Sequence, residues 1–186
     1  MLDPQSEILS TLYRQNREEA NRLADAAAAL TIWEASALGR DAAVEHALAS
    51  DGTLINACSA DGHFPLGLAA FFGHSATVRL LLARGADVTA AARNAMKVQP
   101  LHAAVASRNA ESVALLLGRG ASVNARQQVG YTPLMGAAGG GREDIVQILL
   151  DHGADASLLS DDGKTAADVA REHGHPALAA KLGSPA

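Results

Sequence analysis

The sequence predicts an all-α protein in which short helix pairs stack into a solenoid, and three observations support this prediction. Apolar residues make up 48% of the chain but aromatic residues only 3%, so the apolar content is mostly Ala, Leu and Val, as in packed helices. Apolar side chains within each unit are spaced by three and four residues, which places them on one helical face. One landmark position recurs at intervals of 35, 33 and 33 residues, at Leu66, Leu101, Leu134 and Ala167.

Each unit opens with a turn and a helix start. Proline is favourable at the first position of a helix because its missing N–H would have no partner there, and threonine before it is a good N-cap. Glycine is typical just past a helix end, where the left-handed conformation is common. These signals recur as turns at Asp61-Gly62, Val129-Gly130 and Asp162-Gly163, starts at Pro65, Pro100 and Pro133, caps at Thr132 and Thr165, and ends near Gly39, Gly73, Gly141 and Gly174.

A second helix follows in each unit and carries larger apolar residues. Helices of about ten residues are too short to be stable alone in water, so each unit must bury its apolar face against its neighbours. The expected product is an elongated, slightly curved stack with turns along one edge. The apolar sets of the second helices are Val78, Leu81 and Leu82, then Val113, Leu116 and Leu117, then Val146, Leu149 and Leu150.

These runs resemble the ankyrin repeat family, of the bacterial type. The resemblance rests on QPLHAAV at Gln99–Val105 and YTPLMGAA at Tyr131–Ala138, completed by GHSATVRLLLARGADV at Gly73–Val88 and GREDIVQILLDHGADA at Gly141–Ala156. It covers residues 30–182 and implies an ankyrin repeat solenoid of helix-turn-helix units with β-turn fingers. It also implies about four to five repeats behind an N-terminal capping helix.

The resemblance divides the chain into six segments. Residues 1–29 are interpreted as an N-terminal capping helix, 30–60 as a degenerate first repeat, 61–92, 93–126 and 127–159 as full repeats, and 160–186 as a C-terminal capping repeat. An apolar stripe over residues 6–30 predicts one longer helix, started at Asp3-Pro4, that covers the exposed end of the stack. The alternative is that this helix dimerises or docks a partner. The stripe consists of Leu9, Tyr13, Asn16, Ala20, Leu23, Ala27 and Leu30.

Two departures from the family pattern lie inside the stack. The turn at residues 93–98 lacks Asp-Gly and belongs to the 35-residue interval, so its extra residues predict a longer and more mobile finger. In the family, a threonine and a histidine form structural hydrogen bonds. Gln99 replaces that threonine before His102, and Met135 replaces the histidine after Thr132. An array in which no repeat holds the full pair is expected to be less rigid.

The sequence offers no support for an enzyme, a cofactor or a metal site. Zinc sites need convergent His or Cys ligands, and Cys58 is the only cysteine. As a nucleophile, Cys58 would need a base, an orienting group and an oxyanion site, which a neighbouring His63 does not supply. The glycines at 139–141 lack the following Lys-Ser/Thr of a phosphate-binding loop. His74 and His102 are interpreted as structural.

Charge and hydropathy indicate a soluble protein. The net charge of −5 disfavours nucleic acid as the main partner. No stretch approaches the ~18 apolar residues that cross a bilayer, and no signal peptide is recognisable. A cytoplasmic location is expected, since one cysteine allows no intrachain disulfide. The protein is also expected to be a monomer. Residues 61–126 carry 3 acids and 7 bases, a net charge of +4, whereas residues 1–60 and 127–186 have net charges of −5 and −4. This distribution favours either an acidic partner or, preferably, scattered solvated arginines.

The resemblance locates a partner-binding surface at the turn tips and the exposed ends of the first helices. Three of the six aromatic residues occupy such positions, and aromatic residues and methionine are enriched at binding surfaces. For Phe71 and Phe72, packing on Leu38 of the preceding repeat is the alternative. The candidate partner-binding residues are His63, Phe71, Phe72, Met96, Val98, Ser107, Val129, Tyr131 and Lys164.

The function hypothesis is a scaffold or adaptor that binds a partner protein through the concave groove and the fingers. The alternative is a self-associating regulatory or assembly module that uses the N-terminal helix or the groove. Neither hypothesis names the partner, because a fold does not name a function.

Overall fold

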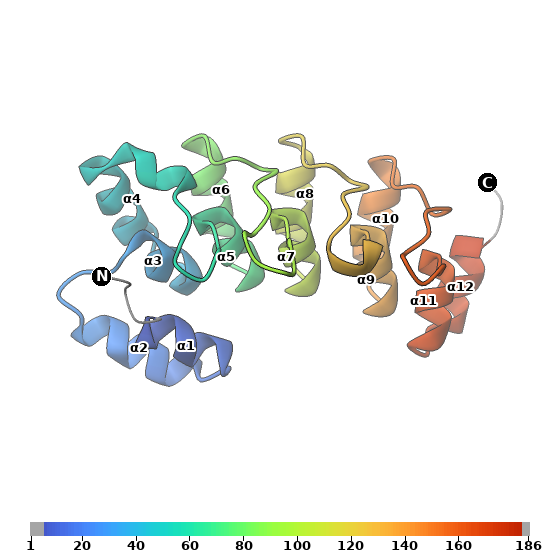
Figure 1. Ribbon diagram of the computed structural model, residues 1–186, viewed down its shortest axis with the longest axis horizontal. Helices are drawn as coiled ribbons and strands as arrows, with labels where there is room; N and C mark the ends of the chain where they lie inside the picture. The colour runs from blue at the N-terminus through green and yellow to red at the C-terminus, as the bar shows by residue number, and fades with distance from the viewer. Residues whose placement is uncertain (1–5, 184–186) are drawn as a thin grey trace.

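The computed structural model describes residues 6–183, and this part of the chain is helical and contains no strand, which confirms the all-α prediction (Figure 1). Two 3-10 helices, Gly52–Asn56 and Gln128–Gly130, lie in connections. The α-helices are α1 (Glu7–Tyr13), α2 (Arg17–Ala26), α3 (Ile32–Leu38), α4 (Asp41–Ser50), α5 (Pro65–Phe71), α6 (Ser75–Ala83), α7 (Pro100–Ala106), α8 (Ala110–Leu117), α9 (Pro133–Gly139), α10 (Glu143–Asp151), α11 (Ala166–Glu172) and α12 (Pro176–Gly183).

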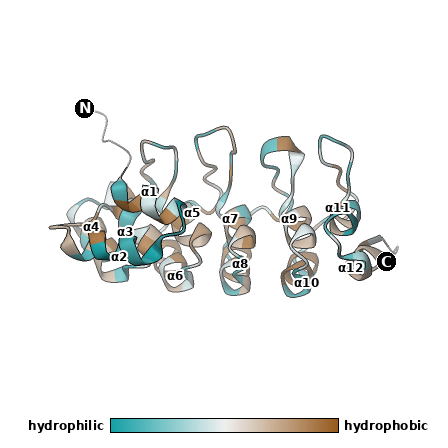
Figure 2. Ribbon diagram, turned by 90° about the horizontal axis from the view of Figure 1, so that it is seen from below, coloured by the Kyte–Doolittle hydropathy of each residue, from teal (hydrophilic) through white to brown (hydrophobic). Residues whose placement is uncertain are grey.

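The helices after α2 stack in pairs along one axis, as Figure 1 shows. In Figure 2, the inner helices α7, α9 and α11 lie toward a row of projecting loops, and the outer helices α6, α8 and α10 lie away from it. We call these loops the first to fourth fingers, at residues 51–64, 84–99, 118–132 and 152–165. The arrangement is the predicted solenoid.

One continuous apolar core runs through the stack. The landmark leucines of the inner helices, Leu66, Leu101 and Leu134, are at most 1% exposed. The outer helices contribute the predicted apolar sets, in which Val113 and Leu116 are fully buried. Leu150 is the exception: it is 36% exposed and lies outside the core, which corrects its place in the predicted set. Burial of a valine or leucine side chain contributes roughly 1.5–3 kcal/mol, so contact between repeats stabilises helices that would not persist alone.

The N-terminal segment forms two helices, which corrects the prediction of one helix over residues 6–30. α1 ends at Tyr13 and α2 begins at Arg17. Between them Gln15 has a φ of 61°, a left-handed conformation that interrupts the helix. The side chain of Asn16 accepts a hydrogen bond from the first turn of α2 at 3.1 Å. The asparagine in the predicted apolar stripe is therefore a helix cap.

The two N-terminal helices lie beneath the ends of α3 and α5 in Figure 1, which corrects the prediction that they cover the end of the stack. Ile8, Leu9 and Leu12 of α1 are buried in a cluster with Ala37 of α3 and Leu68 of α5. We call α1 and α2 the N-terminal helix pair. Its apolar side covers part of the surface that the inner helices would otherwise present.

Polar contacts hold the N-terminal helix pair at both ends. Arg17 Nη2 donates to the Phe72 carbonyl oxygen at 3.0 Å, and Arg40 Nη2 lies 3.0 Å from Asp25 Oδ1. The predicted start at Asp3-Pro4 lies outside the described residues. Within them, the Ser6 side chain caps α1 by accepting a hydrogen bond from its first turn at 3.3 Å.

His102 ties α7 to the third finger. Its Nε2 lies 3.2 Å from the Ala125 carbonyl oxygen and 3.3 Å from that of Tyr131, and the residue is 5% exposed, which confirms its structural role. Gln99 makes no side-chain bond to the start of α7. Gln99 Oε1 and His102 Nδ1 are both buried without a hydrogen-bond partner in residues 6–183. Thr132, at the equivalent position, caps α9 by accepting a hydrogen bond at 3.3 Å.

Gln99→Thr should stabilise the protein. A threonine hydroxyl at this position accepts a bond from the first turn of α7, as Thr132 does in α9, and its proton is available to His102 Nδ1. An N-cap contributes about 1 kcal/mol, so the free energy of unfolding in urea, followed by circular dichroism, should rise by about that amount. Thr132→Ala is the matched control and should lower it similarly. A Gln99→Thr variant no more stable than the parent protein would contradict this prediction.

Two histidines are kept neutral by their surroundings. Burial lowers the pKa of His102 and of His74, and hydrogen bonds to backbone carbonyl groups oppose this shift only in part. His74 Nε2 lies 3.0 Å from the Ala37 carbonyl oxygen, which confirms its structural role. The carboxylate of Asp168 titrates at a lower pH than these histidines, because hydrogen bonds from Thr165 and then from Arg171 hold its pKa at about 2.

Stability should therefore fall as the solution is made mildly acidic. In the unfolded chain both imidazoles have a pKa of about 6.5, so below that pH the unfolded state binds protons that the folded state excludes. The free energy of unfolding should decline from about pH 7 downward and level off once the folded-state pKa values are passed. Urea titrations at several pH values measure this decline. His102→Gln removes one of the two imidazoles and should make the decline of the free energy of unfolding with falling pH less steep. An unchanged slope would show that other groups cause the decline.

Candidate binding groove

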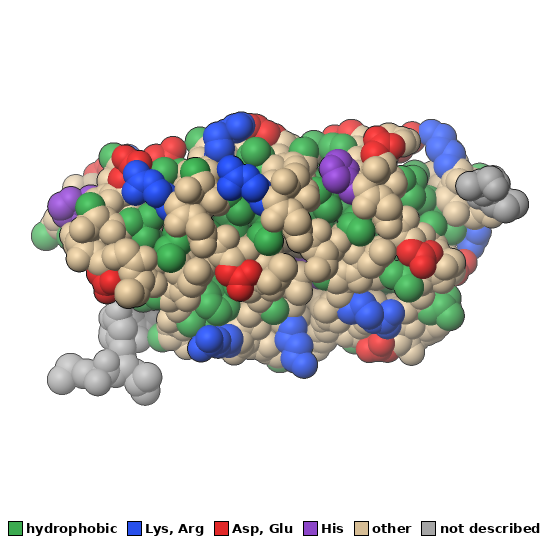
Figure 3. Space-filling model, turned by 90° about the horizontal axis from the view of Figure 1, so that it is seen from above, with side chains coloured by type: hydrophobic (Ala, Val, Ile, Leu, Met, Phe, Trp, Pro, Cys, Tyr) green, Lys and Arg blue, Asp and Glu red, His purple; other side chains and the backbone are tan. Residues whose placement is uncertain are grey.

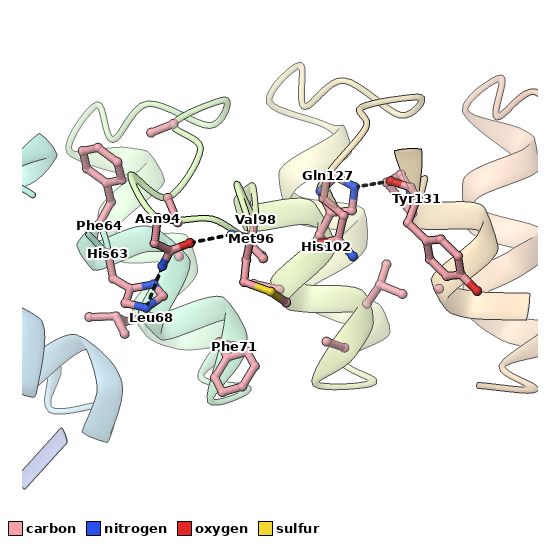
Figure 4. A pocket seen from close by; sticks show the side chains of 18 of the residues that line it. His63, Phe64, Leu68, Phe71, Asn94, Met96, Val98, His102, Gln127 and Tyr131 are labelled. Atoms are coloured by element: carbon pink, nitrogen blue, oxygen red, sulfur yellow. Dashed lines mark hydrogen bonds between the residues drawn. The ribbon is translucent and has the colours of Figure 1, made fainter. Parts of the chain in front are cut away.

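A hollow of about 460 Å³ lies between the fingers and the inner helices near the middle of the stack (Figure 4). Its floor comes from α5, α7 and α9, its wall from the first three fingers, and α1 closes one end through Tyr13. We call this hollow the groove. Because three consecutive inner helices line it, a segment bound there would contact several repeats at once.

Large apolar side chains stand exposed around the groove. Phe71, at the end of α5, is 45% exposed, and Met96, in the second finger, is 51% exposed. Tyr131 extends from the base of the third finger and is half-buried. In Figure 4, Met96 lies between Phe71 and Tyr131, and the ring of Tyr131 extends away from the other two side chains. Exposed apolar surface gathered in one place is typical of a binding site.

Asn94 sets the position of Met96. Its Oδ1 accepts a hydrogen bond from the Met96 N–H at 3.1 Å, and its Nδ2 lies 3.4 Å from His63 Nε2. The Arg93 N–H donates to a carbonyl oxygen of the first finger at 2.7 Å, and the Gln128 N–H donates to the Met96 carbonyl oxygen at 3.2 Å. The long second finger is thus joined to both neighbouring fingers, while its greater mobility stays a prediction.

Tyr13 closes the N-terminal end of the groove within an aromatic cluster. Its ring centroid lies 5.6 Å from that of Phe72 and 6.0 Å from that of His63, and the Phe71 and Phe72 rings meet edge to face at 5.2 Å. Such geometries are favourable for aromatic pairs. Burial, reinforced by the Asp61 carboxylate, raises the pKa of the Tyr13 hydroxyl well above its ordinary value. A neutral phenol therefore forms this end wall.

The structure separates the two adjacent phenylalanines. Phe72 packs into the cluster of the N-terminal helix pair together with Leu38, as the alternative interpretation has it, whereas Phe71 faces the groove. Contact of any of the candidate residues with a partner stays a prediction. Five of the nine line the groove together: His63, Phe71, Met96, Val98 and Tyr131.

Three further candidates lie outside the groove lining. The Ser107 hydroxyl donates to the Ala70 carbonyl oxygen at 2.7 Å, so it bridges two inner helices. Lys164 Nζ lies 2.8 Å from Glu172 Oε2 and also pairs with a second carboxylate. Val129 stands at the tip of the third finger and is 58% exposed. Of these three, only Val129 presents a side chain that is not already engaged within the chain.

The lining residues that sequence reasoning did not choose as candidates include Tyr13, Asn94 and Gln127. Tyr13 was assigned to a capping stripe, and no local signal shows that it reaches the first finger. Asn94 and Gln127 are polar residues in loops, chosen by no apolar pattern. The Gln127 N–H donates to the Tyr131 carbonyl oxygen at 3.0 Å and so shapes the base of the third finger. The 35-residue repeat interval, which contains Asn94, is the sequence signal that indicated an unusual second finger.

The groove is suited to binding apolar side chains. No charged residue lines it, and His102 at its floor is held neutral. Cys58 is half-buried and does not line the groove. In residues 6–183, no cluster of three or more His, Cys, Asp or Glu residues is suited to a metal ion. None of the described helices is long and apolar enough to span a membrane.

Comparison with protein families extends over most of the stack. A family model described as ankyrin repeats (3 copies) matches residues 32–127, and one described as ankyrin repeats (many copies) matches residues 115–170. The chain belongs to the ankyrin repeat family. The three ankyrin inner helices that line the groove lie within these matches.

The curated ankyrin relatives are proteins of several kinds, and the chain matches less than half the length of each. The chain is 35% identical over 141 residues, 76% of its length, to a transient receptor potential cation channel subfamily A member 1 homolog of Caenorhabditis elegans. It is 42% identical over 37% of its length to protein phosphatase 1 regulatory subunit 27 of Homo sapiens. A human ankyrin repeat and KH domain-containing protein 1 is 44% identical over 36%. The matches span 11%, 45% and 3% of these relatives.

Leu12→Ala should release the N-terminal helix pair from the ankyrin stack. Leu12 is 4% exposed, and truncating a buried leucine costs about 2–5 kcal/mol. Hydrogen exchange measured by mass spectrometry should accelerate in residues 7–26, while exchange in α7–α10 stays unchanged. Leu159→Ala is the matched control, because Leu159 is 49% exposed. Equal acceleration throughout the stack would show that the pair is not a separate cooperative unit.

Proposed function

We propose that this ankyrin array is a protein-interaction scaffold or adaptor whose groove holds an extended or helical segment of a partner protein. The observation that carries the proposal is the gathering of large side chains from three repeats around one uncharged hollow: Phe71 and Met96 are exposed, and Tyr131 is half-buried. Ankyrin repeats generally mediate protein–protein interaction, and one relative is named as a regulatory subunit of a phosphatase. Both findings support a binding role.

The proposal includes the setting in which the protein acts. It works by binding and not by catalysis, as a monomer in the cytoplasm, with a protein and not a nucleic acid as its partner. The open groove is suited to binding apolar side chains of a polypeptide. Catalysis would require reactive groups that converge on one point. A single cysteine in the sequence is consistent with a reducing compartment.

Self-association through the N-terminal helix or the groove is the alternative. The apolar side of the N-terminal helix pair is packed against α3 and α5. This packing favours the groove as the surface for self-association. Sedimentation at increasing concentration separates the two cases, because a monomer that stays monomeric leaves the groove open to another protein.

The test is affinity purification with groove variants from cells that produce the protein. The double variant Phe71→Ala and Met96→Ala removes two exposed anchors, each of the kind whose truncation can cost more than about 1 kcal/mol of binding. Partners identified by mass spectrometry with the parent protein should be lost with this variant. Circular dichroism should be unchanged, because neither side chain is buried. Phe72 is unsuitable for this test because its ring supports α1.

Leu159→Ala provides the matched control for the purification. It removes a similarly exposed apolar side chain outside the groove lining, so every partner should be retained. Partners that survive the groove variant but disappear with Leu159→Ala would assign binding to another surface.

A further inference from the structure

Basic residues adjoin the uncharged groove on two sides. The Arg93 guanidinium carbon lies 5.5 Å from the ring centroid of Phe64, a groove residue. Lys97 lies in the second finger directly between two lining residues. Arg108 follows the end of α7, two residues after the lining residue Ala106. All three bases are exposed.

These three bases have no acidic partner in the described part of the chain. None of its ion pairs includes Arg93, Lys97 or Arg108. Residues 61–126 carry only three acids, Asp61, Asp87 and Glu111, against seven bases. Each of the three carboxylates already accepts a bond from a serine or threonine hydroxyl. Unpaired bases therefore adjoin the groove of a protein with net negative charge, while the Asp61 carboxylate lies near Tyr13 at one end of the groove.

Figure 3 shows how charge is distributed on the face opposite the N-terminal helix pair. Acidic and basic side chains are interspersed over most of this face, as on an ordinary soluble surface. Along its lower edge, separate basic side chains and one acidic side chain are visible. Neither sign of charge dominates the middle of this face.

Lys97 holds a backbone conformation that the other fingers give to glycine. It lies four residues before the landmark position of its repeat, where Gly62, Gly130 and Gly163 stand in the other repeats. Their φ values are 87°, 71° and 78°, and Lys97 has a φ of 50°. A lysine in this left-handed region is strained relative to glycine.

Arg108 repeats this pattern at the other end of α7. It lies seven residues after the landmark position, where Gly39, Gly73, Gly141 and Gly174 stand in the other repeats. Those glycines have φ values between 63° and 82°, and Arg108 has a φ of 58°. The fold itself is satisfied by glycine at this position in four repeats. Strain that the fold does not require points to function.

Both exceptions are basic, both belong to the repeat at the centre of the groove, and both adjoin its lining. We propose that the partner segment is acidic: it places a large apolar side chain in the groove and sets Asp or Glu residues against Lys97 and Arg108. The inference rests on the proposed function of the groove and specifies the chemistry of its ligand. Complementary charge at the rim raises the association rate and excludes basic segments. A phosphate backbone would meet the same bases but leave the apolar hollow unfilled.

The test uses random peptides of about a dozen residues, displayed on phage and selected on the intact protein at low salt, where rim charges act most strongly. Selected peptides should carry Asp or Glu within a few residues of Leu, Ile, Phe or Trp. Synthetic copies should bind more weakly at high salt. Lys97→Gly and Arg108→Gly should each weaken their binding by about two- to five-fold, the effect of one exposed charge pair.

The same two variants separate function from structure. Each removes strain as well as charge, so each should unfold at a higher urea concentration than the parent protein while binding acidic peptides more weakly. A merely structural role would make stability and binding move together. Arg119→Gln is the control, because Arg119 also lacks an acidic partner in residues 6–183 but donates to the Leu82 carbonyl oxygen at the outer helices. It should leave peptide affinity unchanged.

The outcomes distinguish the two proposals. Peptides that need Phe71 and Met96 but show no acidic enrichment, or that bind Lys97→Gly and Arg108→Gly as well as the parent protein, overturn the acidic-segment inference and leave the groove proposal standing. Failure to select any peptide that depends on Phe71 and Met96 counts against the groove itself. A single-stranded DNA that binds more tightly than the acidic peptides, with loss in Lys97→Gly, also overturns the inference by assigning the bases to phosphate.

Discussion

The burial of each inner helix between its neighbours is the constraint from which the rest of the structure follows. The inner helices contain only seven residues, too few to persist alone in water, so Leu66, Leu101 and Leu134 must be covered by the adjoining repeats. This requirement fixes the spacing and direction of every repeat. It places no demand on side chains that project from the fingers or from the ends of the inner helices into solvent. Phe71 and Met96 lie exposed on these unconstrained surfaces, which explains why the candidate binding residues gather on one side of the molecule.

The stack could be predicted from the sequence because its signals are repeated, and each unit supports the interpretation of the next. The same reasoning identified His102 as structural, since its position is set by the motif. The N-terminal helix pair could not be predicted in this way. Its division depends on Gln15 adopting a left-handed conformation, which one glutamine does not signal. Phe71 faces the groove and Phe72 packs against the N-terminal helix pair because of where α1 docks. This docking joins segments about 60 residues apart, and no local sequence pattern indicates it.

The repeat at residues 93–126 departs from its neighbours in a consistent direction. It carries the longer finger and two bases, Lys97 and Arg108, in backbone conformations that other repeats give to glycine. Like α5 of the preceding repeat, its inner helix starts without a side-chain cap. Gln99, Lys97 and Arg108 each lower stability relative to the threonine or glycine found at the same position elsewhere in the chain. A protein with many contacts between repeats tolerates a few such losses, and losses retained at one place are characteristic of functional sites. Here they surround the middle of the groove.

Tyr13 makes the groove the joint product of two parts of the chain, the stack and the N-terminal helix pair. A partner segment that touches Tyr13 stabilises the docked pair, and a pair that is docked more firmly binds that segment more tightly, because the two equilibria are linked. A partner that needed the covered ends of α3 and α5 would instead have to displace α1. The docked state is stabilised without a partner by the burial of Leu12 and the packing of Phe72, so the groove is already formed for a segment of the first kind. Under the proposed function, the N-terminal helix pair would close one end of the groove and restrict a partner segment to the repeats that carry the unpaired bases.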